Sequence, residues 1–261
     1  MDLMTIVGLL GGVTVIVFGM IQGQSWASFL NAHGVVLVLG GTIFATMINS
    51  SARELWDAFL AGLSLLKTQS TPSPEQSISQ LVRLAQKARR DGAMSLKDEA
   101  RHVGDGFFSR AIQVSLSSPD QKTAYEILAK EINMIRARHR EVGNLFRTMG
   151  LLGPMFGLLG TLIGIVSVLK NMSDPRSVGP SMALALSSAF YGILFANLIC
   201  VPVAGKLRMR SLNEAIAKEL IVEGILAVVF TNEMPLFIQT RLHAYLQKRQ
   251  NGESSPPEKK A

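Results

Sequence analysis

The stretch MGLLGPMFGLLGTLIGIVSV, residues 149–168, decides the fold of this chain. Its 20 residues carry no charge, and about 20 apolar residues are what an α-helix needs to cross the hydrocarbon core of a bilayer. A second stretch of this kind, MALALSSAFYGILFANLICVPVA, follows at residues 182–204. Two further apolar runs occupy residues 3–21 and 32–48. Together these segments predict an all-α integral membrane protein with four transmembrane helices.

The two N-terminal runs each have an alternative interpretation. The run at residues 32–48 has only 17 residues and contains Gly40 and Gly41, so a re-entrant segment is the alternative to a complete span. The run at residues 3–21 lies at the N-terminus, where a signal peptide would be found. However, Asp2 precedes it without any Lys or Arg, and the run is longer than a usual signal-peptide core. We therefore interpret both as retained membrane helices.

Most charged residues lie in two regions of the chain, and Asp2, Lys170, Asp174 and Arg176 are the exceptions. Of the 26 Lys and Arg residues, 15 lie at residues 51–147 and 9 at residues 206–261, and the acidic residues are divided in the same way. Positive residues accumulate on the cytoplasmic side of membrane proteins. We therefore expect both regions, and both termini, to be cytoplasmic, with the short segments 22–31 and 171–180 outside. The net charge of +7 is then a consequence of topology.

The predicted organisation has five parts. Residues 1–50 hold the first two spans, residues 51–147 a large helical cytoplasmic loop, residues 148–206 the last two spans, residues 207–249 a cytoplasmic C-terminal helix, and residues 250–261 a disordered tail. Within the loop, a helix at residues 77–90 ends at Asp91 and Gly92. No Gly or Pro interrupts residues 120–141, which predicts a long helix that continues toward the third span.

Several functional classes are excluded by residues that the sequence lacks. Cys200 is the only cysteine, so neither an internal disulfide nor a thiolate zinc site is expected. The chain contains no phosphate-binding glycine loop and no nucleophile elbow. The histidines are scattered, at His33, His102, His139 and His243. We predict no enzyme activity, no metal, no other cofactor and no nucleic-acid binding.

The predicted spans contain no Asp, Glu, Lys or Arg, although ion pathways through a bilayer need titratable or coordinating groups. Their polar side chains include hydroxyls and one amide, at Thr42, Thr46, Thr161, Ser167, Ser187, Ser188, Tyr191 and Asn197. Such groups usually pack between helices or donate to helix carbonyls. If this chain transports ions, another subunit has to supply the carboxylate.

Several motifs resemble those of the flagellar motor stator A subunits (the MotA/PomA family). They are EVGNLFRTMG at residues 141–150, PMFGLLGTLIG at 154–164, GPSMALA at 179–185 and Tyr-Gly at 191–192 with Ala-Asn at 196–197, together with GGT at 40–42, EGI at 223–225 and NEMP at 232–235. They occur in the family's order and cover nearly the whole chain.

The resemblance implies a ring of five A subunits, a homopentamer, around a dimer of B subunits (MotB/PomB type) in the bacterial inner membrane. A single span of each B subunit would carry the ion-binding aspartate. The third and fourth spans of the A subunit would line the path, with Pro154 and Pro202 in the family's proline positions. Ion flow would rotate the ring and drive the flagellar rotor.

The resemblance also implies a rotor interface. The family's basic position and its following glycine correspond to Arg89, Arg90 and Gly92. Its acidic partner falls at Lys97, so we expect the neighbouring Asp98 and Glu99 to contact the rotor ring protein (FliG-like) instead. The alternative is an ordinary solvated face.

The coupling ion is the last prediction from the sequence. Sodium-type members of the family have hydroxyls at the positions of Thr161, Ser188 and Ala189, the last two preceding Tyr191. Sodium needs several oxygen ligands, and Ala189 supplies none. We therefore favour H+ over Na+.

Two alternatives to a stator remain open from the sequence. One is an energiser subunit of the ExbB/TolQ class, which has three spans and drives an envelope transport system. The other is a structural membrane protein that needs no B subunit.

Overall fold

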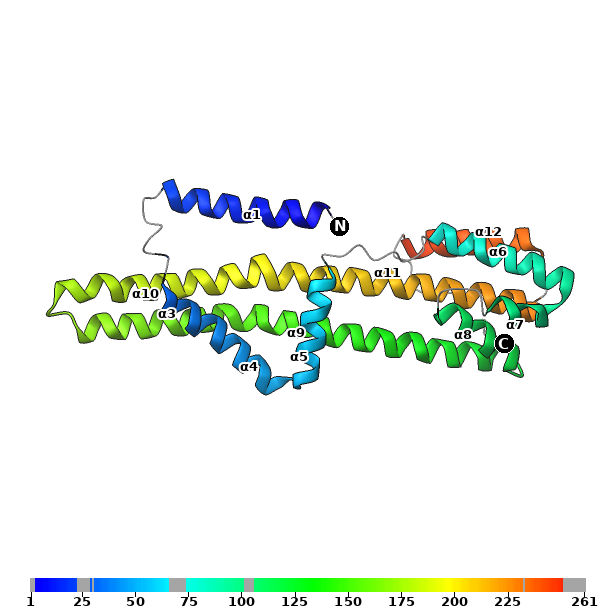
Figure 1. Cartoon of the computed structure of the whole chain (residues 1–261), viewed down its shortest axis with the longest axis horizontal. Helices are drawn as coiled ribbons and strands as arrows, with labels where there is room; N and C mark the ends of the chain where they lie inside the picture. Colours follow the sequence, from blue (N-terminus) through cyan, green and yellow to red (C-terminus); the bar gives the residue numbers. More distant parts are fainter. Residues whose placement is uncertain are drawn as a thin grey trace. The chain divides into compact units, whose positions relative to one another are not determined.

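The computed structural model describes residues 3–22, 29, 31–65, 74–100, 106–231 and 233–250. These residues form helices and no β-strand, which confirms the predicted all-α class (Figure 1). Several expected features lie outside the described residues, namely most of the loop after residue 22, Asp2, His102, Asn232 and the tail from residue 251.

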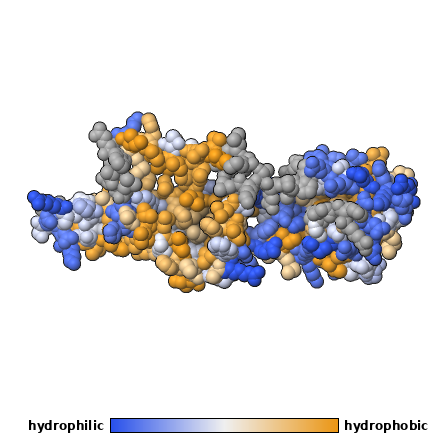
Figure 2. Space-filling view, in the orientation of Figure 1, coloured by the Kyte–Doolittle hydropathy of each residue, from blue (hydrophilic) through white to orange (hydrophobic). Residues whose placement is uncertain are grey.

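The chain divides into two compact units. We call residues 1–69 with 139–209 the apolar unit, and residues 70–138 with 210–261 the polar unit. Figure 2 shows hydrophobic residues over most of the visible face of the first and hydrophilic residues over most of the second. The predicted limits at residues 51 and 147 describe membrane topology, and they remain a prediction.

The N-terminal half of the apolar unit is a series of helices. They are α1 (Leu3–Gln22), α3 (Ala32–Val35), the π-helical η1 (Val36–Gly40), α4 (Gly41–Asn49) and α5 (Ala52–Ser64). The side chain of Asn31 caps α3 by accepting hydrogen bonds from the amides of His33 and Gly34 at 3.0 and 3.3 Å. α3, η1 and α4 follow one another without a break and form the second apolar segment.

Two long helices form the rest of the apolar unit. α9 (Gln121–Lys170) contributes its residues from 139 onward, and α10 (Pro175–Leu194) returns after a short turn. Asp174 caps α10 by accepting a hydrogen bond from the amide of Arg176 at 3.1 Å, and Pro175 occupies the first turn, where a missing N–H has no cost. The expected long helix at residues 120–141 is thus part of α9, which is continuous for 50 residues.

Three helical stretches are long and apolar enough to cross a bilayer, at Ala32–Asn49, Gln121–Lys170 and Arg176–Thr231. A shorter apolar helix spans Ile6–Gln22. Each of the four apolar runs of the sequence lies within or overlaps one of these stretches. His33, one of the scattered histidines, lies inside the second apolar run, at the exposed second position of α3.

The polar unit has a core of its own. Its elements are α6 (Pro74–Asp91), η2 (Ala93–Ser95), α7 (Leu96–Glu99), α8 (Gly106–Ser117), the start of α9, the end of α11 (Val201–Leu226), η4 (Ala227–Thr231) and α12 (Pro235–Gln250). Leu81, Phe108, Ile112, Leu220 and Leu242 are at most 2% exposed in this core. Each such side chain contributes roughly 1.5–3 kcal/mol through its burial.

The C-terminal segment differs from the single helix that we expected at residues 207–249. α11 continues through the π-helical η4 to Thr231, and a new helix, α12, starts at Pro235. Proline has no amide hydrogen and disfavours a helical residue before it, so it is suited to start a helix and not to continue one. The NEMP motif therefore marks the boundary between two helices.

Candidate functional site

α9 and α10, which contain the third apolar run and the start of the fourth, pack through a row of very small residues. A Cβ atom added to each of four α9 glycines would lie within 3.2 Å of α10 or of the π segment after it. The pairs are Gly153 with Gly192, Gly157 with Ala189, Gly160 with Ser188 and Gly164 with Ala185. Ser167 and Ser181 extend the row with hydroxyl oxygens 3.0 Å apart. These small side chains allow the two backbones to approach closely.

Pro154 lies inside α9 and faces the Tyr-Gly pair of α10. A Cβ atom on Gly192 would be 2.5 Å from the carbonyl oxygen of Gly153 and 3.1 Å from the Cα of Pro154. Only glycine fits there, because the neighbouring atoms belong to the backbone. Pro154 donates no hydrogen bond, so the carbonyl of Gly150 lacks its usual partner within the helix. This carbonyl lies in the uncharged part of α9.

Ser188 is completely buried in the apolar unit. Its hydroxyl donates to the carbonyl of Leu184 at 2.7 Å, and it lies against Gly160 and Gly34. Ser187, Thr42 and Thr46 are also buried and donate to carbonyls of their own helices. These four hydroxyls thus bond as packing groups between helices usually do, and a place of Ser188 on the ion path remains a prediction.

Thr161 and Ala189 are only partly buried. The Thr161 hydroxyl donates to the carbonyl of Leu158 at 2.6 Å, which leaves its lone pairs available to another group. The Ala189 backbone packs against Gly157, and its methyl group offers no ligand. Of the three candidate sodium-ligand positions, only Thr161 combines an oxygen with partial exposure.

Tyr191 contacts the segment before the second apolar stretch. Its hydroxyl donates to the carbonyl of Phe29 and accepts from the amide of Asn31 at 3.3 Å. The neighbouring Phe190 packs on the ring of Phe29, with ring centroids 5.0 Å apart. Tyr191 therefore acts here as a link between α10 and the start of α3.

Pro202 lies near the start of α11 and is exposed. A π-helical segment, η3 (Phe195–Cys200), ends directly before it, and the amide of Val201 donates to the carbonyl of Ala196. Inside an α-helix, the ring of Pro202 would collide with the carbonyl four residues earlier. A widened π turn is a common way to accommodate such a residue, and such turns occur frequently at functional sites.

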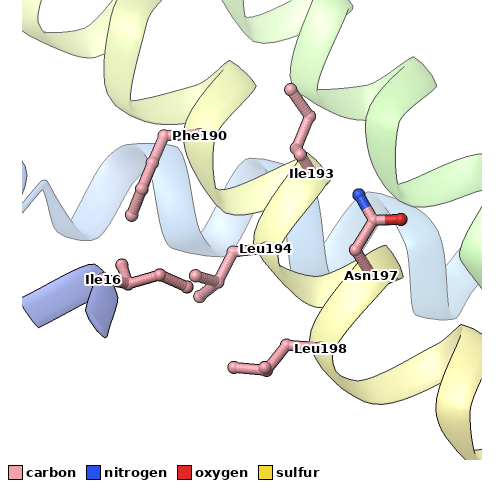
Figure 3. A pocket seen from close by; sticks show the side chains of 6 residues that line it. All are labelled: Ile16, Phe190, Ile193, Leu194, Asn197 and Leu198. Carbon is pink, nitrogen blue, oxygen red and sulfur yellow. The ribbon is translucent and has the colours of Figure 1, made fainter. Parts of the chain in front are cut away.

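A shallow groove of about 200 Å³ lies between α1 and the fourth span. Its described lining comprises Ile16, Phe190, Ile193, Leu194, Asn197 and Leu198 (Figure 3). The Asn197 amide is the only polar side chain among them. A lining of this kind offers hardly any ligand to an ion, so the groove is not a second candidate for the ion path.

The candidate rotor residues gather around the end of α6 and around α7. Arg89 is exposed, and no ion pair involves it among the described residues. Arg90 is also exposed and forms a two-pronged ion pair with Asp91, at 2.9 and 3.0 Å. Glu99 forms an ion pair with Lys87. This pair joins α6 to α7 and does not involve Arg89 or Arg90.

The Arg90–Asp91 pair has a defined dependence on pH. The hydrogen bond from Arg90 lowers the pKa of the Asp91 carboxyl below its ordinary value of 3.8. A lowered pKa means that the contribution of the pair is complete above pH 3.8 and is lost as the pH falls through the lowered pKa. The pair is therefore intact throughout the physiological range.

Two parts of this arrangement were not found from the sequence. Lys87 was not a candidate, although it pairs with Glu99, because 12 residues separate them and no local spacing rule joins such positions. The link from Tyr191 to Phe29 spans 162 residues and has no local signal either. Among the described residues, no group of three or more His, Cys, Asp and Glu side chains could hold a metal ion.

Comparisons with known proteins agree on one family. The MotA/TolQ/ExbB proton channel family matches residues 99–219. The chemotaxis protein PomA of Vibrio alginolyticus is 31% identical over 95% of this chain and 96% of its own length. Motility protein A of Cereibacter sphaeroides is 33% identical over 96% and 97%. The flagellar MotAB stator complex from Bacillus subtilis contains a chain with the same fold, with a TM-score of 0.84 and 24% identity over 97% and 99%.

Proposed function

We propose a function from the premise that this chain belongs to the MotA/TolQ/ExbB proton channel family. The chain is a stator subunit of the flagellar motor and is not an enzyme. This assignment favours the motor over the ExbB/TolQ-type alternative, because the similar proteins are motility and chemotaxis proteins.

One observation carries the mechanism: the packed third and fourth spans contain no carboxylate. α9 and α10 meet through glycines, serines and alanines. In residues 149–168 and 182–204 the polar side chains are hydroxyls and the Asn197 amide, and the carbonyl of Gly150 lacks its usual helical donor because of Pro154. An ion crossing this region needs a group that binds and releases it. We therefore propose that a MotB-type B subunit supplies an aspartate, and that α9 and α10 line the ion path around this aspartate.

The proposed coupling ion is the proton. Hard cations such as Na+ require several oxygen ligands in place of their water. Ser188 is buried and bonded within its own helix, Ala189 has no oxygen, and Thr161 offers one hydroxyl. A proton needs only the aspartate and a route for water.

The proposed assembly is a pentamer of this chain around a B dimer in the inner membrane, with four spans and both termini in the cytoplasm. The apolar stretches and the distribution of Lys and Arg support this topology. The polar unit would then meet the rotor through Arg89, Arg90, Asp98 and Glu99, which surround one end of α6.

Deletion of the gene in its own host tests this function. We expect cells that assemble complete flagella but do not swim, and restoration of swimming when the gene is returned with its B-subunit gene. Normal swimming combined with a loss of outer-membrane uptake would instead favour an energiser of the ExbB/TolQ class. Normal swimming without any envelope defect would favour a structural membrane protein.

A further inference from the structure

α5, which directly follows the second apolar stretch, has three different faces along its 13 residues. One face packs on the apolar unit, since Ala58 is 2% exposed and a Cβ atom on Gly62 would lie 3.1 Å from the ring of Phe146. Leu65, at the C-terminal cap, continues this buried face with 4% exposure. This contact fixes α5 on α9.

The second face of α5 is apolar and has no partner among the described residues. Trp56 is 62% exposed, Phe59 55%, Leu60 48% and Leu63 47%. The rings of Trp56 and Phe59 stack with centroids 5.9 Å apart, so the face is continuous. Soluble surfaces rarely expose apolar patches of this kind without a partner.

The third face of α5 is polar. At about 100° per residue, Arg53, Asp57 and Ser64 lie on one side of the helix, next to the apolar face. All three are exposed. A short helix with adjoining apolar and charged faces is typical of segments that lie in the plane of a membrane surface.

The position of α5 along α9 matches such a surface. α5 crosses α9 at Phe146, directly before the exposed Arg147 and the uncharged run that starts at residue 149. Figure 1 shows α5 running across the direction of α9, and not alongside it. If α9 spans the bilayer, α5 lies parallel to the bilayer plane, where apolar residues give way to basic ones.

The chain also turns sharply between α4 and α5. Ser50 has an extended backbone, with φ −141° and ψ 149°. Ser51 then starts α5 with a capping box, in which the Ser51 hydroxyl accepts from the amide of Glu54 and the Glu54 carboxylate accepts from the amide of Ser51. The exposed apolar side chains of α4, such as Phe44 and Ile48, therefore lead directly into those of α5.

We propose that the apolar face of α5, formed by Trp56, Phe59, Leu60 and Leu63, is embedded in the bilayer at the boundary between headgroups and acyl chains. Trp56 sits where tryptophan is enriched in membrane proteins. Arg53 and Asp57 remain on the water side. The assignment of α5 to the inner leaflet of the bilayer rests on the proposed topology. The apolar face of α5 consequently contacts lipid and not the rotor.

Fluorescence quenching by brominated lipids tests this proposal in the full-length chain. The chain has 2 tryptophans, so Trp26→Phe leaves Trp56 as the only one. In bilayers of phosphatidylcholine and phosphatidylglycerol brominated near the headgroup end of the acyl chain, we expect Trp56 to lose about half of its emission. The emission should also be shifted to the blue.

The matched control moves the tryptophan by one position on the same helix. Trp26→Phe, Trp56→Phe and Asp57→Trp together place it on the polar face, where we expect little quenching and red-shifted emission. Equal quenching at both positions would overturn the proposal. Blue-shifted emission from Trp56 without quenching would also overturn it, because a neighbouring copy would then cover the face.

This experiment separates the proposal from the proposed function. It needs neither a B subunit nor ion flow, and circular dichroism checks that each variant keeps its helix content. If Trp56 is unquenched but the chain restores swimming, the proposed function stands and the proposal of a lipid-facing helix is wrong. If the chain does not restore swimming but Trp56 is quenched, the proposed function is wrong and the lipid-facing helix stands.

Discussion

Gly160 of α9 and Ser188 of α10 meet so closely that a Cβ atom on Gly160 would lie 2.5 Å from the Ser188 hydroxyl oxygen. Real Cβ atoms essentially never approach another heavy atom to within 3.0 Å. The contact therefore sets the separation of the two spans at the level of the candidate ion path. It also explains why Ser188 is completely buried.

Replacing this glycine should separate the spans. We expect Gly160→Ala to destabilise the assembled complex by about 1–3 kcal/mol, the usual cost of overpacking. Swimming should be lost or slowed. Thermal unfolding in detergent and swimming speed measure the two effects.

Two matched variants control this prediction. Gly143→Ala changes another α9 glycine, around which a Cβ atom meets nothing within 4 Å, so it should not destabilise the protein. Ser188→Gly removes the Cβ atom that collides, so combining it with Gly160→Ala should restore part of the stability. Wild-type stability of Gly160→Ala alone would contradict the packing that we describe.

The main features of the fold were predictable because they depend on local sequence. A run of 20 uncharged residues predicts a membrane helix wherever it occurs. Gly92 was expected to end a helix, and it is the described glycine with a positive φ, at 85°. The fourth apolar run likewise predicted a helix, which the structure places in α10, η3 and α11.

The remaining features depend on distant partners or on small energy differences. The π segments at η1 and η3 involve ordinary apolar residues, such as Val38 and Leu198, which have no sequence signature for a π turn. The apolar face of α5 was not identified, because Trp56 and Phe59 alternate with charged residues and the run is too short to span a bilayer. The burial of Ser188 depends on Gly160, 28 positions away.

The coupling ion gives a second prediction. Swimming speed should persist in sodium-free buffer and collapse when a protonophore dissipates the proton gradient. Ser188→Ala should change neither behaviour, since its hydroxyl donates to Leu184 inside the protein and its loss costs about 1 kcal/mol. Speed that rises steeply with external sodium and survives the protonophore would make Na+ the ion.

The rotor interface gives a third prediction. Arg89→Glu should impair swimming without affecting membrane insertion or complex formation, because Arg89 is exposed in the last turn of α6. Arg90→Glu should also impair swimming, but its effect tests the rotor interface less specifically, because this change also breaks the ion pair with Asp91.

Arg83→Glu is the control for this prediction. It makes the same charge change on the same helix, also at an exposed position. Unchanged swimming of Arg89→Glu, at normal and at raised salt, would mean that this end of α6 is an ordinary solvated surface.

Proton flux into vesicles is the most direct test of the central claim, that this chain forms an ion path only with a B subunit. The full-length chain is reconstituted alone, with a B subunit whose plug segment has been removed, and with the same B subunit after its intramembrane Asp has been changed to Asn. The account predicts flux only in the second preparation, because the spans of this chain contain no Asp or Glu. Flux from the chain alone, or undiminished flux with the Asn variant, would contradict it.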